Sequence, residues 1–498
     1  MRDLYPDAHR QLRNEESLDP EDWQAMRKLG RRMIDDMMTY LETIRDRPVW
    51  QPIPDDVKQK FNISLPANPQ KPEDIYEEFL DHILPHPMGN IHPRFWGWVI
   101  GTGTVLGMLA ELLAAGMNPC PGGADHIANY VEAQVLEWCK QMLDYPPEAS
   151  GLLVSGCSMA NFVGLTVARN SMAGFDIRRE GLQGAQKTMT FYGSFETHSS
   201  NQKAIELLGL GSASLRQIPV NADFQIVLPE LEAAILKDRR DGFKPICVIG
   251  NAGTVNTGAI DDLNSLADLC RRENLWFHVD GAFGALASLS PDLRPLVSGI
   301  ERADSLAFDF HKWMYMPYEI GCVLVRHEPS HRRAFSTTPD YLAHAERGLA
   351  GGSLWFSEYG VELSRGFKAL KVWMSIKEHG IEKYGRLIRQ NVDQARYLAH
   401  LVDNSPRLER LAPVPLNIVC FRFKDNSHDR DLNFVNQEIL MRLQEKGIAA
   451  PSHTTISGQY VLRVAVTNHR SRKEDFDLLV EEVVRLGEEI LKEGSERV

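Results

Sequence analysis

The chain has 498 residues, 43% of them hydrophobic and 24% charged, with a formal net charge of −12. This composition describes a globular chain long enough for about two or three domains. The acidic balance argues against nucleic acid or an anionic membrane as the main partner, because both attract basic surfaces. The sequence has no apolar signal core at its start and no stretch of roughly 18 apolar residues, so we expect a cytoplasmic protein with a small-molecule substrate.

The seven cysteines lack C-x-x-C spacing, and the sixteen histidines include no H-E-x-x-H pattern. Neither a disulfide framework nor a metal site is therefore indicated. We expect free thiols and no bound metal.

The first 95 residues predict a helical arm followed by an extended connector. Asp19, Pro20 and Glu21 are typical of a helix start, with the aspartate as cap and the proline in the first turn. Apolar side chains from Met26 to Ile44 recur at steps of three and four residues, so one face of this helix needs a partner surface. Packing within the same domain and packing in a dimer are both open. Residues 45–95 are rich in proline, which is typical of an extended segment that wraps over a neighbour.

Residues 96–375 alternate helix-period segments with short apolar runs that end in Gly, Asn or Asp. This alternation predicts a large α/β domain with a mostly parallel sheet and crossover helices. Residues 376–498 alternate amphipathic helices with strands, such as 418–423 and 460–466, and finish in a helix around 473–492. They predict a smaller α+β domain.

A phosphate cradle is predicted where the apolar run 151–155 is followed by Gly156, Cys157 and Ser158. Strand, tight turn and helix start come in that order, and the first backbone amides of such a helix bind phosphate. Gly156 allows a close backbone approach. Taken alone, the segment would also fit an ordinary glycine turn with a serine cap.

Two further apolar runs end in charged residues. The run 275–279 leads to Asp280, and the run 305–308 leads to Asp309 and Lys312. Ligands bind at the carboxyl ends of strands in α/β sheets. A lysine amine condenses with the aldehyde of pyridoxal 5′-phosphate, and a carboxylate against the pyridine nitrogen keeps the ring able to accept electrons. Each residue alone would be read as a surface charge, but together they indicate an enzyme with this cofactor.

The segment 336–344 is polar, contains Pro339, and is followed by Gly348, Gly351 and Gly352. This pattern is typical of a mobile active-site loop. Tyr341 is its candidate working residue, although by itself it would be an ordinary loop aromatic.

Six short motifs are spread along most of the chain: His92-Pro93-Arg94-Phe95, Ser155-Gly156-Cys157-Ser158-Met159-Ala160-Asn161, Thr197-His198-Ser199-Ser200, Asn251-Ala252-Gly253-Thr254, His278-Val279-Asp280-Gly281-Ala282-Phe283 and His311-Lys312-Trp313. In these motifs the chain resembles the group II pyridoxal-phosphate-dependent decarboxylases, and most closely their aromatic amino acid branch. The resemblance implies the aspartate aminotransferase-like fold type I of PLP-dependent enzymes, with a large, mostly parallel α/β domain and a smaller α+β C-terminal domain.

The resemblance also implies roles for individual residues. Lys312 matches the lysine that holds the cofactor covalently, Asp280 the partner of the pyridine nitrogen, and His198 the imidazole that stacks on the ring and approaches the substrate carboxylate. Cofactor contacts are implied for Lys312, Asp280, His198, Ala282 behind the ring, Cys157, Ser158 and His311 at the phosphate, Thr254 near the phenolic oxygen, and Ser364. In relatives the contact at Ser364 comes from the partner subunit, which implies a homodimer with shared active sites and with residues 1–95 as a dimer-forming arm.

Tyr341 matches the loop tyrosine of this family, which delivers a proton after carbon dioxide departs. Relatives with phenylalanine at this position are aldehyde synthases, so a tyrosine favours simple decarboxylation. The catalytic residues implied are Lys312, Tyr341, His198 and Asp280, and the substrate-binding residues are Trp98, Ile100, His198 and Tyr341. We therefore expect decarboxylation of an L-amino acid, aromatic or large and apolar, to its amine.

Other functions stay open. The segment 117–121, which lies near the partner's pocket residues in relatives, has no aromatic wall, so a branched aliphatic substrate is an alternative. An acidic substrate or aldehyde synthase chemistry on the same cofactor is another. A catalytically silent dimeric interaction protein is a remote alternative, because such a homologue is expected to lose the lysine, the carboxylate or the tyrosine, and all three are present.

Overall fold

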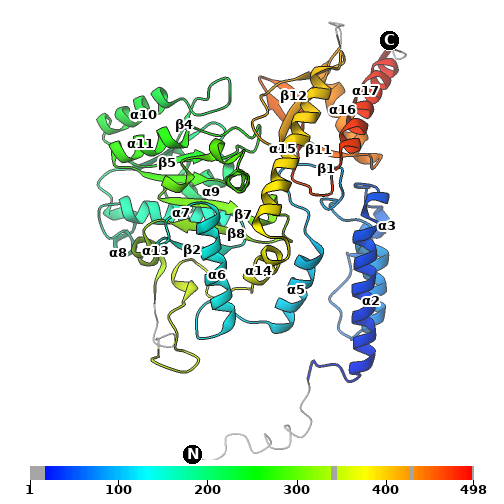
Figure 1. Cartoon of the computed structure of the whole chain (residues 1–498), viewed down its shortest axis with the longest axis horizontal. Helices are drawn as coiled ribbons and strands as arrows, with labels where there is room; N and C mark the ends of the chain where they lie inside the picture. The colour runs from blue at the N-terminus through cyan, green and yellow to red at the C-terminus, as the bar shows by residue number, and fades with distance from the viewer. Residues whose placement is uncertain (1–16, 338–344, 426–430, 496–498) are drawn as a thin grey trace, which may run out of the picture. The chain divides into compact units, whose positions relative to one another are not determined.

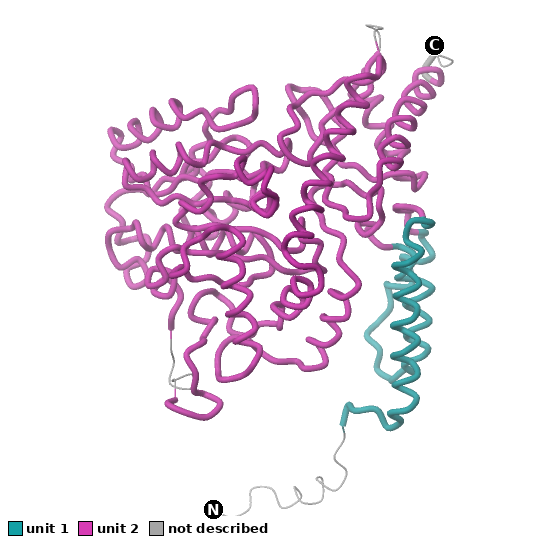
Figure 2. Tube along the Cα trace, viewed as in Figure 1, with its two compact units in different colours: residues 1–47, 54–86 teal, residues 48–53, 87–498 magenta. Residues whose placement is uncertain are grey.

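The computed structural model describes residues 17–337, 345–425 and 431–495. The chain divides into two compact units, one with residues 1–47 and 54–86 and the other with residues 48–53 and 87–498 (Figure 2). The expected domain boundaries at residues 95 and 375 stay a prediction. In the described part of the chain, no helix has both the length and the apolar character needed to cross a membrane.

The smaller unit is helical, with α2 (Trp23–Glu42), a 3₁₀ turn (Ile44–Asp46), α3 (Asp55–Lys60), α4 (Pro72–Glu78) and a π-helical turn (Phe79–Ile83). α2 begins later than Asp19 would suggest. The side chain of Asp22 accepts hydrogen bonds from the backbone amides of Gln24 and Ala25, at 2.8 and 3.0 Å, and so caps the helix. Within this unit, the Tyr76 hydroxyl donates to Asp36 at 2.9 Å and ties α4 to α2.

The larger unit is built on a seven-stranded sheet with the order β2-β8-β7-β6-β5-β3-β4 (Figure 1). β8 runs antiparallel to β2 and to β7, and the other neighbouring pairs are parallel. The strands are β2 (Ser150–Val154), β3 (Met189–Ser194), β4 (Leu215–Ile218), β5 (Lys244–Asn251), β6 (Trp276–Asp280), β7 (Ser305–Asp309) and β8 (Gly321–Val325). The predicted α/β architecture with a mostly parallel sheet is confirmed.

Helices cover both faces of this sheet. Successive side chains of a strand point to opposite faces, so each strand contributes side chains to the packing on both faces. On β6, the ring of Phe277 lies near Leu263 and Leu266 of α11, whereas His278 lies against Gly164 of α7. Strands buried in this way on both faces are typical of parallel sheets. The helices before α14 are α5 (Val105–Met117), α6 (Ile127–Met142), α7 (Cys157–Met172), α8 (Ile177–Glu180), α9 (Ser199–Leu207), α10 (Leu228–Arg240), α11 (Leu263–Glu273), α12 (Phe310–Trp313) and α13 (Glu328–Phe335).

A second sheet of five strands has the order β1-β11-β12-β10-β9. Its strands are β1 (Phe95–Trp96), β9 (Leu408–Arg410), β10 (Ile418–Phe423), β11 (Ala450–Ile456) and β12 (Gln459–Ala465), and the remaining helices are α14 (Ala369–His379), α15 (Ile381–Asp403), α16 (Leu432–Glu445) and α17 (Lys473–Ser495). β10 and β12 match the predicted strands 418–423 and 460–466. β1 joins this sheet by pairing in parallel with β11, so the segment around residue 95 lies at the edge of the C-terminal sheet.

Candidate active site

A cavity of about 430 Å³ lies at the carboxyl edge of the seven-stranded sheet. Asp280 ends β6, Asp309 ends β7, and the turns after β2, β3 and β5 also contribute to its lining. Parallel strands end at one edge, which is where α/β sheets bind ligands. Lys312, on the short helix α12 that follows β7, faces the same cavity as Asp280.

Asp280 is 5% exposed, and its two oxygens have different surroundings. Oδ2 accepts hydrogen bonds from the side-chain amides of Asn161 and Asn201, both at 2.8 Å. Oδ1 accepts two weaker hydrogen bonds, one of 3.2 Å from the backbone amide of Ala282 and one of 3.5 Å from the thiol of Cys157. Oδ1 is therefore the oxygen with remaining capacity for a ligand. Burial alone would raise the pKa of this carboxyl, but interactions with His198 and the amide of Asn201 outweigh it and hold the pKa below its ordinary value.

Lys312 forms an ion pair with Asp309, whose Oδ2 lies 3.0 Å from Nζ. The lysine side chain is 21% exposed and the aspartate side chain 2% exposed. Burial opposes the positive charge, but the Asp309 carboxylate raises the pKa of Lys312 above its ordinary value. His311 lies on the other side of the same carboxylate, with Nε2 at 3.6 Å from Oδ2. Asp309 thus holds the amine in place at the cavity wall.

The turn between β2 and α7 fits a phosphate group. α7 begins at Cys157, and the first amides of a helix of this length have no partner within the helix. A Cβ atom added to Gly156 would lie 3.3 Å from Cε1 of His311 and 3.6 Å from Oδ1 of Asp309, so a side chain there would crowd the turn. Ser158 lines the cavity beside it. An amine, a buried carboxylate and a helix start around one cavity are the groups that pyridoxal phosphate needs.

The other residues expected at the site divide into two groups. Those that line the cavity are Trp98, Cys157, Ser158, His198, Thr254, Asp280, Ala282, His311 and Lys312. Ile100 does not line it but packs near Val49, Phe95 and Ala450. Ser364 is exposed at the surface, away from the cavity of its own chain. Tyr341 lies outside the described residues.

His198 caps α9, because its Nδ1 accepts a hydrogen bond of 3.2 Å from the backbone of Ser200. Its Nδ1 also lies 2.8 Å from Oγ of Ser200. These contacts fix the imidazole at the cavity wall. Desolvation lowers the pKa of His198, which favours the neutral ring near pH 7.

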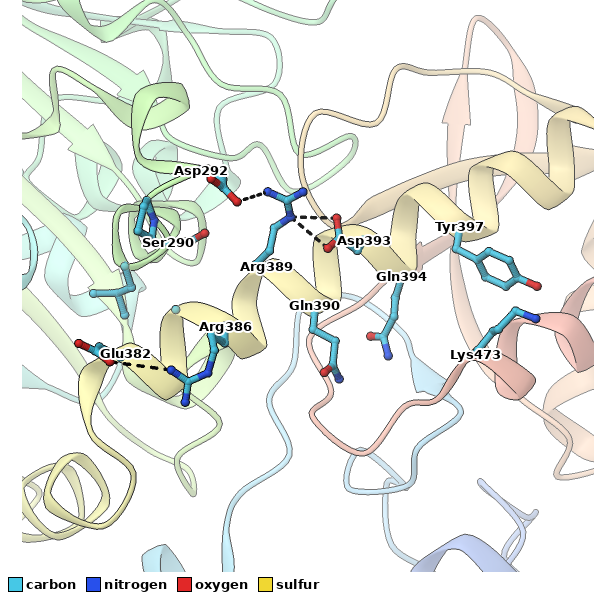
Figure 3. Close-up of a pocket in the computed structure, with 13 residues that line it drawn as sticks. Ser290, Asp292, Glu382, Arg386, Arg389, Gln390, Asp393, Gln394, Tyr397 and Lys473 are labelled. Carbon is cyan, nitrogen blue, oxygen red and sulfur yellow. Dashed lines mark hydrogen bonds and ion pairs between the residues drawn. The ribbon is translucent and has the colours of Figure 1, made fainter.

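A larger cavity of about 680 Å³ runs along α15 (Figure 3). Its charged side chains bind one another: Arg389 lies 2.6 Å from Asp292 and 2.9 Å from Asp393. Arg386 and Glu382 form a looser pair at 3.9 Å. Exposed ion pairs of this kind are common on protein surfaces and carry no chemistry by themselves, so the cavity at the strand ends is the better candidate.

Comparison with known proteins shows the family of the chain. Residues 54–424 match the family model described as the pyridoxal-dependent decarboxylase conserved domain. The chain is 34% identical to an aromatic-L-amino-acid decarboxylase of Bacillus atrophaeus, over 94% of this chain and 96% of that protein. The chain belongs to the pyridoxal-dependent decarboxylase family. It is therefore a PLP-dependent carboxy-lyase.

Two further comparisons concern the fold of this decarboxylase and the activities of its relatives. The crystal structure of Oryza sativa TDC with PLP and tryptamine superposes with a TM-score of 0.87 at 25% identity, over 95% of this chain and all (100%) of that one. A phenylacetaldehyde synthase of Arabidopsis thaliana is 28% identical over 93% of this chain and 97% of that protein. The family thus includes both decarboxylases and aldehyde synthases.

Several polar residues of the decarboxylase's cavity were not assigned from the sequence. Asn161 and Asn201 bind Asp280, Asp309 binds Lys312, and Glu196 lines the cavity after β3. A signal existed for Asn161, which follows Cys157 by one helical turn and so faces the same side of α7. Asp309 ends the same predicted strand that leads to Lys312. The contact of Asn201 depends on how α9 packs, which the sequence pattern does not reveal.

Proposed function

We propose that this protein decarboxylates an L-amino acid with an aromatic or large apolar side chain, and that the products are the corresponding amine and carbon dioxide. The observation that carries the proposal is that Lys312 and Asp280 line one cavity, and that Oδ1 of Asp280 accepts only the weaker hydrogen bonds of Ala282 and Cys157. The relatives named as aromatic-L-amino-acid and tyrosine decarboxylases support an aromatic substrate.

When bound, pyridoxal phosphate supplies an aldehyde that condenses with amines and a ring that takes up the electron pair of the broken bond. Lys312 would hold it covalently through Nζ and give way to the amine of the substrate. Asp280 would keep the ring nitrogen protonated through Oδ1, because Oδ2 is occupied by Asn161 and Asn201. His198 would cover one face of the ring and orient the substrate carboxylate for departure.

The proton that replaces the lost carboxylate is assigned to Tyr341, on the basis of the family resemblance. A phenol can donate a proton in a closed site and recover it from solvent afterwards. Lys312 then releases the amine product as it returns to its covalent position. The first experiment is a panel of amino acids scored for carbon dioxide and amine, which we expect to appear in equal amounts with an aromatic substrate.

The polar lining of the cavity supports a substrate without an acidic side chain. Among the described residues that line it, none is an arginine, and the lysine, Lys312, is paired with Asp309; the carboxylates are those of Glu196, Asp280, Asp309 and Glu319. An acidic side chain would need a cationic partner to offset its desolvation. Trp98, which is 57% exposed, offers an apolar wall at the same place. A preference for glutamate or aspartate in the panel would contradict this assignment.

We also propose a homodimer with shared active sites. α5 exposes Leu112, Leu113 and Met117, which are 54%, 50% and 57% exposed, and contiguous apolar surface of this kind is typical of an interface. Ser364 is exposed and so accessible to the phosphate site of a second copy. Leu113→Arg is expected to raise the dissociation constant of the dimer in analytical ultracentrifugation, and an unchanged constant would count against this surface.

The proposed location is the cytoplasm, and the residues that support it are the seven free cysteines. Unpaired thiols are typical of a reducing compartment. Fractionation of cells that produce the protein tests this point directly.

Covalent attachment is tested by borohydride. We expect the purified protein to be yellow, and reduction to bleach the colour and fix the cofactor on Lys312. Lys312→Ala is expected to bind the cofactor without fixation and to release no carbon dioxide. Aldehyde, ammonia and peroxide in place of the amine would instead favour the aldehyde synthase alternative, which the phenylacetaldehyde synthases among the relatives keep open.

A further inference from the structure

A line of buried hydrogen bonds runs away from the cavity behind Asp280. Nδ2 of Asn161 donates to Oδ2 of Asp280 at 2.8 Å, and Oδ1 of Asn161 lies 3.0 Å from Nε2 of His278. Nδ1 of His278 lies 2.7 Å from Oγ of Ser305, which accepts from Nε1 of Trp276 at 2.8 Å. Four of these side chains are at most 5% exposed, and Trp276 is 7% exposed.

The chemistry of the two ends sets the direction of every bond in this line. An indole nitrogen can only donate, and an ionised carboxylate can only accept. Because Asp280 accepts from the NH₂ group of Asn161, the amide oxygen faces Nε2 of His278, and a neutral imidazole that donates there accepts from Ser305 on Nδ1. The proton of the imidazole then lies on Nε2 and is donated to Oδ1 of Asn161. The amide of Asn161 is thereby held with its NH₂ group toward Asp280.

The imidazole of His278 has the protonation state that this line requires. Burial lowers its pKa to about 4, so the ring is neutral near pH 7 and carries a single proton. Room for the ring is provided by Gly164 in the middle of α7. A Cβ atom there would lie 2.9 Å from Cε1 and 3.0 Å from Nδ1 of His278. Glycine is unfavourable inside a helix, so its presence here reflects the close approach of the imidazole.

We propose that His278 is a positioning residue for the cofactor: it orients the amide of Asn161 so that Asp280 stays ionised and aimed at the ring nitrogen. This inference rests on the proposed role of Asp280. His278 does not line the cavity, and its hydrogen bond toward the site is the one to Asn161. Ser305 contributes a hydroxyl that donates to Nδ1 of His278, and Trp276 donates to the oxygen of that hydroxyl.

The same contacts indicate what happens when His278 is replaced. Without the imidazole, Oδ1 of Asn161 keeps only the long hydrogen bond from the thiol of Cys157, at 3.8 Å, so the amide can turn and present its oxygen to Asp280. Two oxygens would then face each other, which favours protonation of the carboxyl. Asn201 still donates to Oδ2, and Lys312 is unaffected, so the cofactor is expected to bind. The loss should therefore appear in the protonation of the ring nitrogen more than in cofactor content.

The test uses holoenzyme loaded with pyridoxal phosphate that carries ¹⁵N in the ring, observed by solid-state NMR. Wild type is expected to give the shift of a protonated ring nitrogen. His278→Leu is expected to move the shift toward the neutral position and to lower kcat roughly tenfold, the equivalent of one pKa unit. His278→Gln keeps a donor for Asn161 and is expected to restore most of the wild-type shift.

Two further variants keep the test decisive if His278→Leu does not fold. Trp276→Phe removes the indole N–H donor together with part of the ring, and is expected to give a smaller change of shift in the same direction. His331→Gln is the matched control, because His331 is a buried histidine with both nitrogens bonded, to Ser150 and to the backbone of Tyr359, and it does not line the cavity. It is expected to lower stability and leave the ¹⁵N shift unchanged.

Unchanged ring protonation in both His278→Leu and Trp276→Phe would overturn the inference. An equal change in His331→Gln would also overturn it, because the effect would then be one of general stability. A wild-type protein that binds no cofactor, or holds it with a neutral ring nitrogen, would contradict the proposed function itself and so is distinguishable from failure of the role of His278.

Discussion

Replacement of Asp280 by asparagine is the sharpest test of the site, because the structure predicts how the new amide will lie. Oδ2 of Asp280 accepts from two amides, Asn161 and Asn201, at 2.8 Å each. In Asp280→Asn, only the carbonyl oxygen can satisfy both donors. The NH₂ group must therefore take the place of Oδ1, beside the cavity. A donor in that place faces the ring nitrogen and holds it unprotonated.

The expected decrease in kcat of Asp280→Asn follows from the interaction that the substitution removes. The variant removes a charge that stabilises the electron-rich ring during the reaction and puts a mismatched dipole in its place. Loss of one such preorganised group typically lowers kcat by about 10²–10³-fold, or ~3–4 kcal/mol. Cofactor binding should change much less, because Lys312 and the start of α7 are untouched. We therefore expect a loaded enzyme that turns over slowly.

The assay is carbon dioxide release per bound cofactor, with cofactor content measured by absorbance after alkaline release. The matched control is Asp238→Asn, a buried carboxylate that binds Arg216 at 2.9 Å and Tyr192 at 2.6 Å, none of which lines the cavity. This control is expected to be less stable with a normal kcat. A nearly normal rate in fully loaded Asp280→Asn would refute the role given to this carboxylate.

Three other predictions concern the loop, the core and pH. Tyr341→Phe is expected to divert product from amine to aldehyde, ammonia and peroxide; amine alone in product analysis would contradict the role of Tyr341. Glu132→Gln removes the buried counter-charge of the Arg365 guanidinium, 3% exposed, and should cost about 3–5 kcal/mol in urea unfolding; a loss similar to that of a surface ion pair would contradict this. Burial lowers the pKa of His331 to about 3, so the unfolded chain binds more protons below its own pKa near 6.5. The contribution of His331 to the stability of the apoprotein should fall by roughly 4 kcal/mol between pH 6.5 and 3, so His331→Gln should flatten the dependence of stability on pH.

The predicted residues that the structure brings to one cavity are mainly those that end a strand or follow it closely. Asp280 ends β6 and Lys312 lies three residues after β7, so knowing the strands was enough to bring both to one edge of the sheet. Gly156 and Cys157 follow β2 in the same way. In a parallel sheet, position along the chain and position in space are linked at the carboxyl ends, which is why short motifs located most of this site.

Features that depend on long-range packing were not predictable in this way. Ile100 follows the same segment as Trp98, yet it packs near Val49 and Ala450, because β1 pairs with β11 from the far end of the chain. Likewise, the start of α2 at Trp23 was set by which aspartate reached the free amides, and both Asp19 and Asp22 are suitable cap residues.

The polar network behind Asp280 forms where one face of β6 packs against one face of α7. On β6, His278 and Asp280 are two residues apart and so point to the same face, toward α7. On α7, Cys157, Asn161 and Gly164 are separated by steps of four and three and face the sheet. The parallel register places His278 beside Ser305 of β7. The face of β6 that packs against α7 thus carries the hydrogen bonds that orient the carboxylate of Asp280. Buried core residues therefore influence the electrostatics of the site.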